Sequence, residues 1–291
     1  LGCIRAISDE RRRCTSLKAI LSGNEAIARG AYEAGIEIVT GYPGTPSSEI
    51  ITTIARQYGE AIYTEWSANE KVAMDAAAGA AYSGRRALVT TKQVGMNVLS
   101  DSLLYAVYTG TEAGLVVVTA DDPGMHSSQN EQDNRWYARL MKIPLLEPAD
   151  SQEAKDFVLT AIQLSERFDT PVLVRTVMRT SHSKSVVSFG ERQPSGKQPG
   201  PFPRNPAKYN CTASNARHMH PRVEKRLEQI ARKAVVDLAI EAEVIKVTNY
   251  NDIMKYPILS TPGLVINEQL VSSGRIPTPA EVTTWLADAL S

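Results

Sequence analysis

The residues of this chain that could do chemistry lie in loops that follow short apolar segments. The first such loop, Gly41–Glu49 (GYPGTPSSE), contains two glycines and two prolines that fix a turn directly before a helical pattern. Thr45, Ser47 and Ser48 place hydroxyl groups at that helix start, where backbone N–H groups favour an anion such as a carboxylate. A tight turn with an ordinary N-cap uses the same residue types. The loop is therefore a candidate anion site, with the N-cap as the alternative.

A second candidate is Glu70, which follows the segment EWSAN and opens an alanine-rich helical pattern. The helix dipole favours a carboxylate in the first turn. A solvated first-turn glutamate, with no function, is the alternative. Glu65 is a competing carboxylate, but it lies at the end of an apolar segment and not at a helix start.

Two further loops carry polar side chains. The segment KQVGMN supplies Lys92, Gln93 and Asn97 next to a glycine, and the segment ADDPGMHSSQ contains His126. The second loop is long and polar for a connection between a strand and a helix, which favours a functional role. Plain connections and a surface histidine remain the alternatives for these residues.

The apolar segments and the patterns between them predict the elements that position these loops. Short runs rich in valine, isoleucine and leucine are typical of strands buried on both faces. Strands and helices alternate, which predicts an α/β fold with a doubly wound parallel sheet and ligands at the carboxyl ends of the strands. The predicted strands are Ile36–Thr40, Ala61–Glu65, Ala87–Thr91, Leu115–Thr119 and Val172–Thr176, and the predicted helices are Gly23–Glu33, Ser47–Tyr58, Glu70–Ser83, Val98–Thr109 and Ser151–Phe168.

The composition excludes several classes of function. Lys+Arg and Asp+Glu are both 32 among 291 residues, so the chain has no basic excess for nucleic-acid phosphates. It has no apolar run of about 18 residues that would predict a transmembrane helix, and no secretory signal, so we expect a cytoplasmic protein. The three cysteines, Cys3, Cys14 and Cys211, show no CxxC spacing. They exclude a four-cysteine iron–sulfur cluster or an all-cysteine zinc site made by these residues alone.

Changes in composition divide the sequence into four predicted parts. Residues 1–20 are basic and aperiodic and read as a tail, and residues 21–187 form the large α/β domain. Residues 188–220 contain five prolines and several glycines, which predicts a linker or an extended arm. Residues 221–291 form a smaller α/β part, with a helix over about 221–238, a strand near 243–247, a short helix over 250–255, a hairpin over 264–272 and a last helix from Pro279.

Residues 21–187 closely resemble the N-terminal, pyrimidine-binding domain of the indolepyruvate:ferredoxin oxidoreductase α subunit family. The segments that carry the resemblance are LSGNEAIARGAYEAGI, GYPGTPSSEI, EWSANEKVAMDAAAGAAYSG, RALVTTKQVGMNV, LVVVTADDPGMHSSQNEQD and TPVLVRTVMRTSHSKS. A weaker resemblance continues to about Ile230 through NPAKYN and SNARHMHPRVEKRLEQI.

The resemblance implies a thiamine diphosphate enzyme that oxidatively decarboxylates an indolepyruvate-like 2-oxoacid to an acyl-coenzyme A. In the family, the glutamate that matches Glu70 hydrogen-bonds N1′ of the aminopyrimidine and promotes its imino tautomer. An apolar wall favours this sharing of a proton, and Ala73, Ala76 and Ala77 could supply one. The resemblance assigns Glu70, Lys92, Gln93 and Asn97 to the cofactor, and Thr45, Ser47 and His126 to the substrate, with no metal ligands.

The family's α subunit also has a diphosphate-binding domain with a Gly-Asp-Gly motif, and cluster cysteines, neither of which occurs in this sequence. The resemblance therefore implies a partner domain or subunit that brings the diphosphate site, magnesium and iron–sulfur clusters. The resemblance further implies that ferredoxin takes the electrons, that coenzyme A takes the acyl group, and that the site forms in an oligomer.

Residues from about Ala234 to Leu286 (AEVIKVTNYNDIMKYPILSTPGLVINEQLVSSGRIPTPAEVTTWL, within that range) resemble small thioredoxin-like redox-active disulfide proteins. Thr261-Pro262 matches the position of that fold's cis-proline. The first strand and the Cys-x-x-Cys of that fold are absent, so this part is expected to be a truncated, redox-incompetent module. Two functions follow as alternatives: a subunit of the oxidoreductase, or a non-catalytic association protein in which a relic domain is fused to this module.

Overall fold

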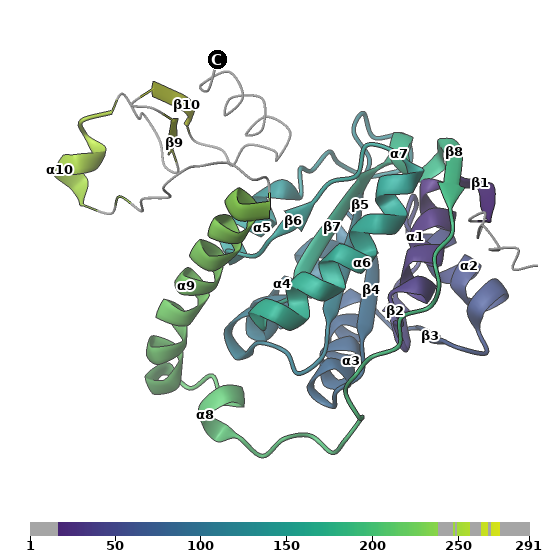
Figure 1. Ribbon diagram of the computed structural model, residues 1–291, viewed down its shortest axis with the longest axis horizontal. Helices are drawn as coiled ribbons and strands as arrows, with labels where there is room; N and C mark the ends of the chain where they lie inside the picture. Colours follow the sequence, from purple (N-terminus) through teal and green to yellow (C-terminus); the bar gives the residue numbers. More distant parts are fainter. Residues whose placement is uncertain (1–16, 238–246, 248, 257–262, 267–268, 274–291) are drawn as a thin grey trace, which may run out of the picture.

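The predicted parallel α/β fold is confirmed by a computed structural model, which describes residues 17–237, 247, 249–256, 263–266 and 269–273. A six-stranded sheet has the order β3-β2-β4-β5-β7-β6, and every neighbouring pair in it is parallel. Figure 1 shows this sheet at the centre of the molecule between helices. The strands are β2 (Ile38–Gly41), β3 (Tyr63–Trp66), β4 (Ala87–Lys92), β5 (Leu115–Asp121), β6 (Leu145–Leu146) and β7 (Val172–Val177).

The strand order reverses between β2 and β4. The chain first moves from β2 outward to β3 and then returns to place β4 on the other side of β2. Gly41, at the carboxyl end of β2, lies opposite Trp66 of β3 and Thr90 of β4. At such a reversal the two loops diverge, and ligands of open α/β sheets bind in the resulting crevice. The fold therefore places the loop after β2 and the loop after β4 at the expected ligand edge.

Two hydrophobic clusters cover the two faces of the sheet, because successive side chains of a strand point to opposite faces. In β5, Val116 and Val118 belong to the first cluster, whereas Leu115 and Val117 belong to the second. Each large aliphatic side chain buried in this way contributes roughly 1.5–3 kcal/mol. The first cluster is covered by α1 (Gly23–Glu33), α2 (Ser48–Tyr58) and α6 (Ser151–Phe168), and the second by α3 (Glu70–Tyr82), α4 (Gly95–Thr109) and α5 (Arg135–Met141).

The five predicted helices and five predicted strands of the large domain are confirmed, with small differences at their ends. The helix predicted from Val98 begins at Gly95, and the strands end one or two residues later than expected. The prediction missed β6, which has only two residues. It also missed a ribbon in which β1 (Lys18–Ser22) pairs antiparallel with β8 (Lys184–Ser188), next to α7 (Met178–His182). Four of the ten ribbon residues are exposed, and its apolar stretches, residues 19–21 and 186–187, are only two or three residues long. The ribbon also includes residues 18–20 of the predicted tail.

The predicted linker over 188–220 is an extended arm only as far as residue 205. It contains α8 (Pro206–Tyr209) and the start of α9 (Ala213–Asp237), so the helix predicted from Pro221 begins upstream of that proline. Figure 1 shows the arm running along the body of the domain before α9.

The described residues of the C-terminal part form α10 (Tyr250–Ile253) and the predicted hairpin, β9 (Gly263–Ile266) with β10 (Gln269–Ser273). Residues 243–246 of the predicted strand, the Thr261-Pro262 pair and the helix predicted from Pro279 lie outside the described residues. None of the helices in the described part of the chain combines the length and the apolar character that crossing a membrane requires.

Candidate active site

Glu70 is the first residue of α3, and the residue before it caps the helix. The Asn69 side-chain oxygen accepts a hydrogen bond of 3.0 Å from the Val72 N–H, which satisfies one of the donors that a helix start leaves open. Glu70 itself is only 8% exposed. Its carboxylate has no hydrogen-bond partner within the described residues. A mostly buried acceptor without a partner in the chain is available to a ligand.

The start of α4 approaches the Glu70 carboxylate closely, and a glycine makes this possible. A β-carbon added at Gly95 would lie 2.5 Å from Glu70 Oε1 and 2.0 Å from the hydroxyl oxygen of Thr91. Both distances are shorter than any real contact of a β-carbon, so a side chain at position 95 would displace the carboxylate. Gly95 therefore fixes where the Glu70 carboxylate can lie.

The predicted apolar wall beside Glu70 is partly wrong. Ala73 and Ala77 are fully buried in the second cluster, but Ala76 is exposed. The reason is the helical period, which carries a residue six positions after Glu70 to the outer face of α3. The competing carboxylate, Glu65, accepts a hydrogen bond of 2.8 Å from the Tyr63 hydroxyl at the outer strand β3, so it already has a partner.

Lys92 joins the loops at the reversal of the strand order. A β-carbon at Gly44 would lie 2.9 Å from Cγ and Cδ of Lys92, so the loop after β2 rests directly on the lysine stem. The Lys92 Nζ lies 3.4 Å from Oε1 of Gln129, in the loop after β5. Three of the four predicted loops therefore meet at this side chain.

Gln93 and Asn97 hold the loop after β5 against the start of α4. Gln93 is fully buried, and its Nε2 donates to the Asn130 carbonyl at 3.1 Å. Asn97 is exposed; its Nδ2 donates to Gln132 Oε1 at 3.1 Å, and its Oδ1 accepts from the Tyr137 hydroxyl. The Gln93 Oε1 has no partner within the described residues. Both residues are two positions from Gly95 in the chain, and their side-chain hydrogen bonds join the start of α4 to the loop after β5 and to Tyr137 of α5.

The loop after β2 separates its hydroxyl groups. Thr45 is exposed and forms a cis peptide bond with Pro46. Ser47 is fully buried and donates to the Gly44 carbonyl at 2.9 Å, so its hydroxyl shapes the loop from inside. The Ser47 side chain does not cap α2. Of the two predicted substrate residues in this loop, only Thr45 lies at the surface.

His126 lies on the exposed part of the loop after β5. Its backbone N–H donates to Asp122 Oδ1 at 3.1 Å, and the Ser127 N–H donates to Asp122 Oδ2 at 2.7 Å. Burial raises the pKa of Asp122, but these hydrogen bonds together with one from Ser128 outweigh it and hold the pKa below its usual range. Within the described residues, no hydrogen bond joins the His126 ring to Glu70.

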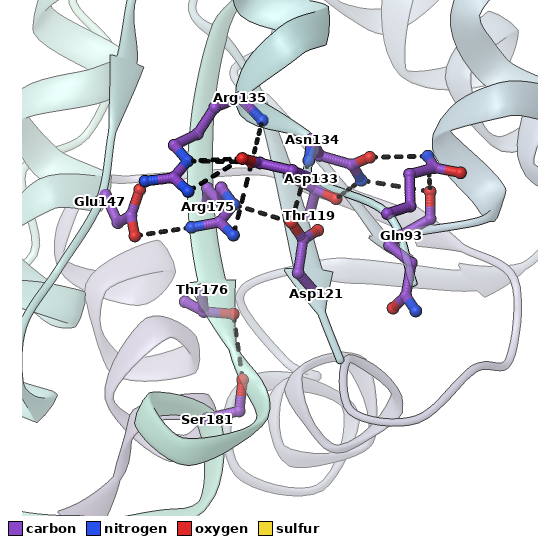
Figure 2. A network of polar contacts seen from close by, with 11 residues as sticks. Gln93, Thr119, Asp121, Asp133, Asn134, Arg135, Glu147, Arg175, Thr176 and Ser181 are labelled. Carbon is purple, nitrogen blue, oxygen red and sulfur yellow. Dashed lines mark hydrogen bonds and ion pairs between the residues drawn. The ribbon is translucent and has the colours of Figure 1, made fainter. Parts of the chain in front are cut away.

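The sequence prediction missed a buried charge network at the ends of β5 and β7. Arg175 of β7 is 4% exposed and contacts Asp121, Asp133 and Glu147 (Figure 2). Burial raises the pKa of Asp121, although its contacts with Arg175 and with the Asn134 N–H act in the opposite direction. The available signal was an arginine inside an otherwise apolar strand, because a buried guanidinium requires carboxylates around it.

The described residues contain no group of three His, Cys, Asp or Glu side chains that could hold a metal ion. Cys211 contacts the sulfur of Met219, and His220 Nδ1 lies 2.9 Å from the Tyr108 hydroxyl.

Comparisons with known proteins agree with this fold and with the predicted family. Residues 29–246 match the family "Pyruvate flavodoxin/ferredoxin oxidoreductase, thiamine diP-bdg", and residues 222–287 match the family "Thioredoxin domain". The chain is similar to the indolepyruvate oxidoreductase subunit IorA of Archaeoglobus fulgidus, at 45% identity over 78% of this chain and 37% of that protein. It is also similar to the IorA of Thermococcus kodakarensis, at 45% identity over 73% of this chain and 34% of that protein. The chain thus spans little more than a third of the length of these relatives.

Among solved structures, the chain is similar to a 2-oxoglutarate:ferredoxin oxidoreductase from Magnetococcus marinus. The TM-score is 0.59 at 18% identity, over 80% of this chain and 47% of that one. This likeness shows the fold, and the sequence matches confirm both predicted resemblances. The chain therefore belongs to the thiamine-diphosphate-binding domain family of the pyruvate flavodoxin/ferredoxin oxidoreductases.

Proposed function

We propose that this chain supplies the pyrimidine-binding half of a thiamine diphosphate site in a 2-oxoacid:ferredoxin oxidoreductase of the indolepyruvate type. The observation that carries the proposal is the Glu70 carboxylate. It lies at the carboxyl edge of the sheet, is mostly buried, and has no hydrogen-bond partner within the described residues. The relatives named as indolepyruvate oxidoreductase subunits support the substrate class.

The residues around Glu70 fit an aromatic ring nitrogen as the missing partner. Glu70 supplies an acceptor, and Gly95 keeps the space beside it free of a β-carbon. When bound, thiamine diphosphate supplies the electron sink that a 2-oxoacid needs in order to lose carbon dioxide. Glu70 would hold a proton shared with N1′ of the pyrimidine.

The other predicted residues take the roles that their places allow. Lys92, Gln93 and Asn97 would border the cofactor, because they surround the start of α4 next to Gly95. Thr45 and His126 would face the substrate from the exposed loops after β2 and β5, and Ser47 would support Thr45 from inside its loop.

The complete reaction needs groups that this sequence does not encode. It has no Gly-Asp-Gly motif and only three cysteines, so the diphosphate site, its magnesium and the iron–sulfur clusters would come from a partner domain or subunit. Electrons would then pass to ferredoxin, and coenzyme A would accept the acyl group. We expect an oligomer in which the site forms between domains, and no nucleic-acid partner.

The test is calorimetry of thiamine diphosphate and magnesium with the full chain, alone and with a partner that carries a diphosphate domain. We expect binding with the partner. The Glu70→Gln variant should retain much of the affinity but abolish exchange of the cofactor C2 proton. Glu65→Gln is the matched control and should exchange normally. Unchanged exchange in Glu70→Gln would show that another carboxylate acts.

A non-catalytic association protein is the second candidate, and one observation favours it. The segment that matches the thioredoxin family, residues 222–287, contains no cysteine, so it cannot carry out dithiol chemistry. Absence of cofactor binding both with and without the partner would favour this second function over the first.

A further inference from the structure

Arg175 is a buried charge that the proposed chemistry does not use. It donates to Asp121 Oδ2 through Nε at 2.8 Å and to Glu147 Oε1 through Nη1 at 2.6 Å. A third carboxylate, Asp133, lies 3.6 Å from Nη2. Figure 2 shows the guanidinium between these groups, at the ends of β5 and β7. Because the planar fork reaches two carboxylates in different directions at once, it fixes their relative positions.

Asp121 passes this constraint to the loop after β5. The oxygen that accepts from Arg175 also accepts from the Asn134 N–H at 3.0 Å. Asn134 is fully buried, and its Nδ2 donates to the Thr119 hydroxyl at 2.6 Å and to the Gln93 carbonyl at 3.2 Å. A continuous path of buried hydrogen bonds therefore runs from Arg175 to Gln93.

The Gln93 carbonyl is where the path reaches α4. It accepts from Asn134 Nδ2, from Gln132 Nε2 at 2.8 Å, and from the Met96 N–H at 3.2 Å. Two of these donors come from the loop, and the third closes the first turn of the helix. The loop after β5 thus fixes the Gln93 carbonyl, which accepts the hydrogen bond of the first turn of α4.

The same first turn contains Gly95, whose close approach to Glu70 leaves the carboxylate little freedom. A shift of about an ångström in this turn would move the surface against which Glu70 rests, and misplacement on that scale is enough to impair a catalytic group. The Glu70 carboxylate therefore depends on the loop after β5.

We propose that Arg175 is a positioning residue for the Glu70 site: through Asp121 and Asn134 it fixes the first turn of α4. The proposal rests on the proposed function for the chemical role of Glu70. The position of the turn can nevertheless be measured without any cofactor, so the two can fail separately.

Two variants interrupt the path at different points. Arg175→Lys keeps the buried charge but cannot reach Asp121 and Glu147 together. Asn134→Ala leaves the charges intact and removes the link to Gln93, which keeps the proposal testable if Arg175→Lys does not fold. The control is Thr176→Val, the next residue of the same strand. It removes a buried hydroxyl pair with Ser181 of 3.0 Å, which lies on the side away from the loop (Figure 2).

The measurement is amide hydrogen exchange of Met96 and Asn97 in the full chain without ligand, because their N–H groups bond to the Gln93 and Val94 carbonyls. We expect exchange to be about tenfold faster in Arg175→Lys, which disrupts charge-assisted hydrogen bonds, and in Asn134→Ala, which removes the neutral hydrogen bond to the Gln93 carbonyl. Exchange should be unchanged in Thr176→Val. The double variant should also be about tenfold faster, since both changes break one path. The proposal would be overturned if amide exchange in the double variant were about a hundredfold faster, as additive effects would give. It would also be overturned if Thr176→Val accelerated exchange equally, or if Asn134→Ala left the exchange rate unchanged.

A second measurement uses the full chain with its partner and thiamine diphosphate. Arg175→Lys should slow exchange of the C2 proton about tenfold while changing the cofactor affinity less than twofold, because a positioning residue acts on the placement of Glu70. If the exchange rate of the C2 proton and the cofactor affinity fell by equal factors, Arg175 would not be a positioning residue. If the wild-type chain binds no cofactor, the proposed function fails, while the amide exchange still decides the role of Arg175.

Discussion

Two glycines of neighbouring helices show how much one β-carbon matters in this molecule. Gly95, in the first turn of α4, has the Glu70 carboxylate and the Thr91 hydroxyl where its β-carbon would lie. Gly79, in α3, has no atom within 4 Å of that position and is exposed. The first glycine is required by its surroundings. The second only costs conformational freedom, because glycine destabilises a helix interior relative to alanine.

The two substitutions to alanine should therefore have opposite effects. Gly95→Ala should lower the free energy of unfolding by about 1–3 kcal/mol through overpacking, and should weaken thiamine diphosphate binding by displacing Glu70. Gly79→Ala should leave binding unchanged and raise stability by up to about 1 kcal/mol. Chemical denaturation measures the free energy of unfolding of each variant, and calorimetry with the partner measures its affinity for thiamine diphosphate. A Gly95→Ala protein that binds as tightly as wild type would show that the close approach to Glu70 is not needed.

At the scale of elements, an ion pair joins the start of β4 to α6. Arg86 donates to both oxygens of Glu166, at 2.8 Å and 2.9 Å, and also to the Ala34 and Gln193 carbonyls at 2.8 Å. Burial raises the pKa of Glu166, but the hydrogen bonds and charge of Arg86 outweigh it and hold the pKa below its ordinary value of 4.5. The pair is only partly exposed, so solvent screens it weakly.

This pair predicts a specific pH dependence. A carboxyl whose pKa is lower in the folded state contributes stability above its unfolded pKa, and that stability is lost as the pH falls through the folded pKa. Glu166→Gln should cost about 2 kcal/mol at neutral pH. It should also flatten the decline in the free energy of unfolding between about pH 5 and about pH 3, measured by denaturant titration. The control Glu60→Gln, at an exposed glutamate, should change neither the stability at neutral pH nor its decline in acid. If stability declined in acid as steeply in Glu166→Gln as in wild type, the pair with Arg86 would not be the cause of that decline.

The elements that could be predicted from the sequence are those with a local signal. β4 and β5 begin with the apolar runs at residues 87–89 and 115–118. The helix α1 follows Ser22, which forms a capping box with Glu25 three residues later. β6 and the ribbon of β1 and β8 depend on pairing between distant residues, so no local pattern reveals them. The site divides in the same way. Glu70 could be predicted from its motif, whereas its contact with Gly95 depends on how α3 packs beside α4.

At the scale of the whole molecule, the proline-rich arm is part of the domain. Glu33 is fully buried and accepts from the Gly190 N–H at 2.7 Å and from Lys155 Nζ at 2.8 Å. Further along, Gly200 donates to the Ser83 carbonyl at 3.0 Å, and just after the arm Lys208 of α8 donates to Glu112 at 2.8 Å. Composition predicted a linker or an extended arm and did not reveal its contacts with the domain, because the segment has few apolar groups whose pattern would indicate packing. The arm is held instead by hydrogen bonds to backbone carbonyls and to buried charges.

Arg192 makes several of these contacts and gives the last prediction. Its guanidinium donates to the Tyr32, Ile36 and Ala61 carbonyls at 2.8, 3.0 and 3.3 Å and stacks 5.0 Å from the Tyr32 ring. Arg192→Ala leaves three carbonyls without this donor and should lower the free energy of unfolding by about 2 kcal/mol.

The same variant should speed limited proteolysis within residues 189–205 severalfold, because the arm would open without global unfolding. The matched control is Arg204→Ala, an exposed arginine of the same arm that has no hydrogen bond within the described residues. Its cleavage rate should equal that of wild type. If Arg192→Ala lowers stability but leaves the arm as resistant as before, the arm and the domain open only together. The guanidinium would then stabilise the whole fold rather than fasten the arm to it.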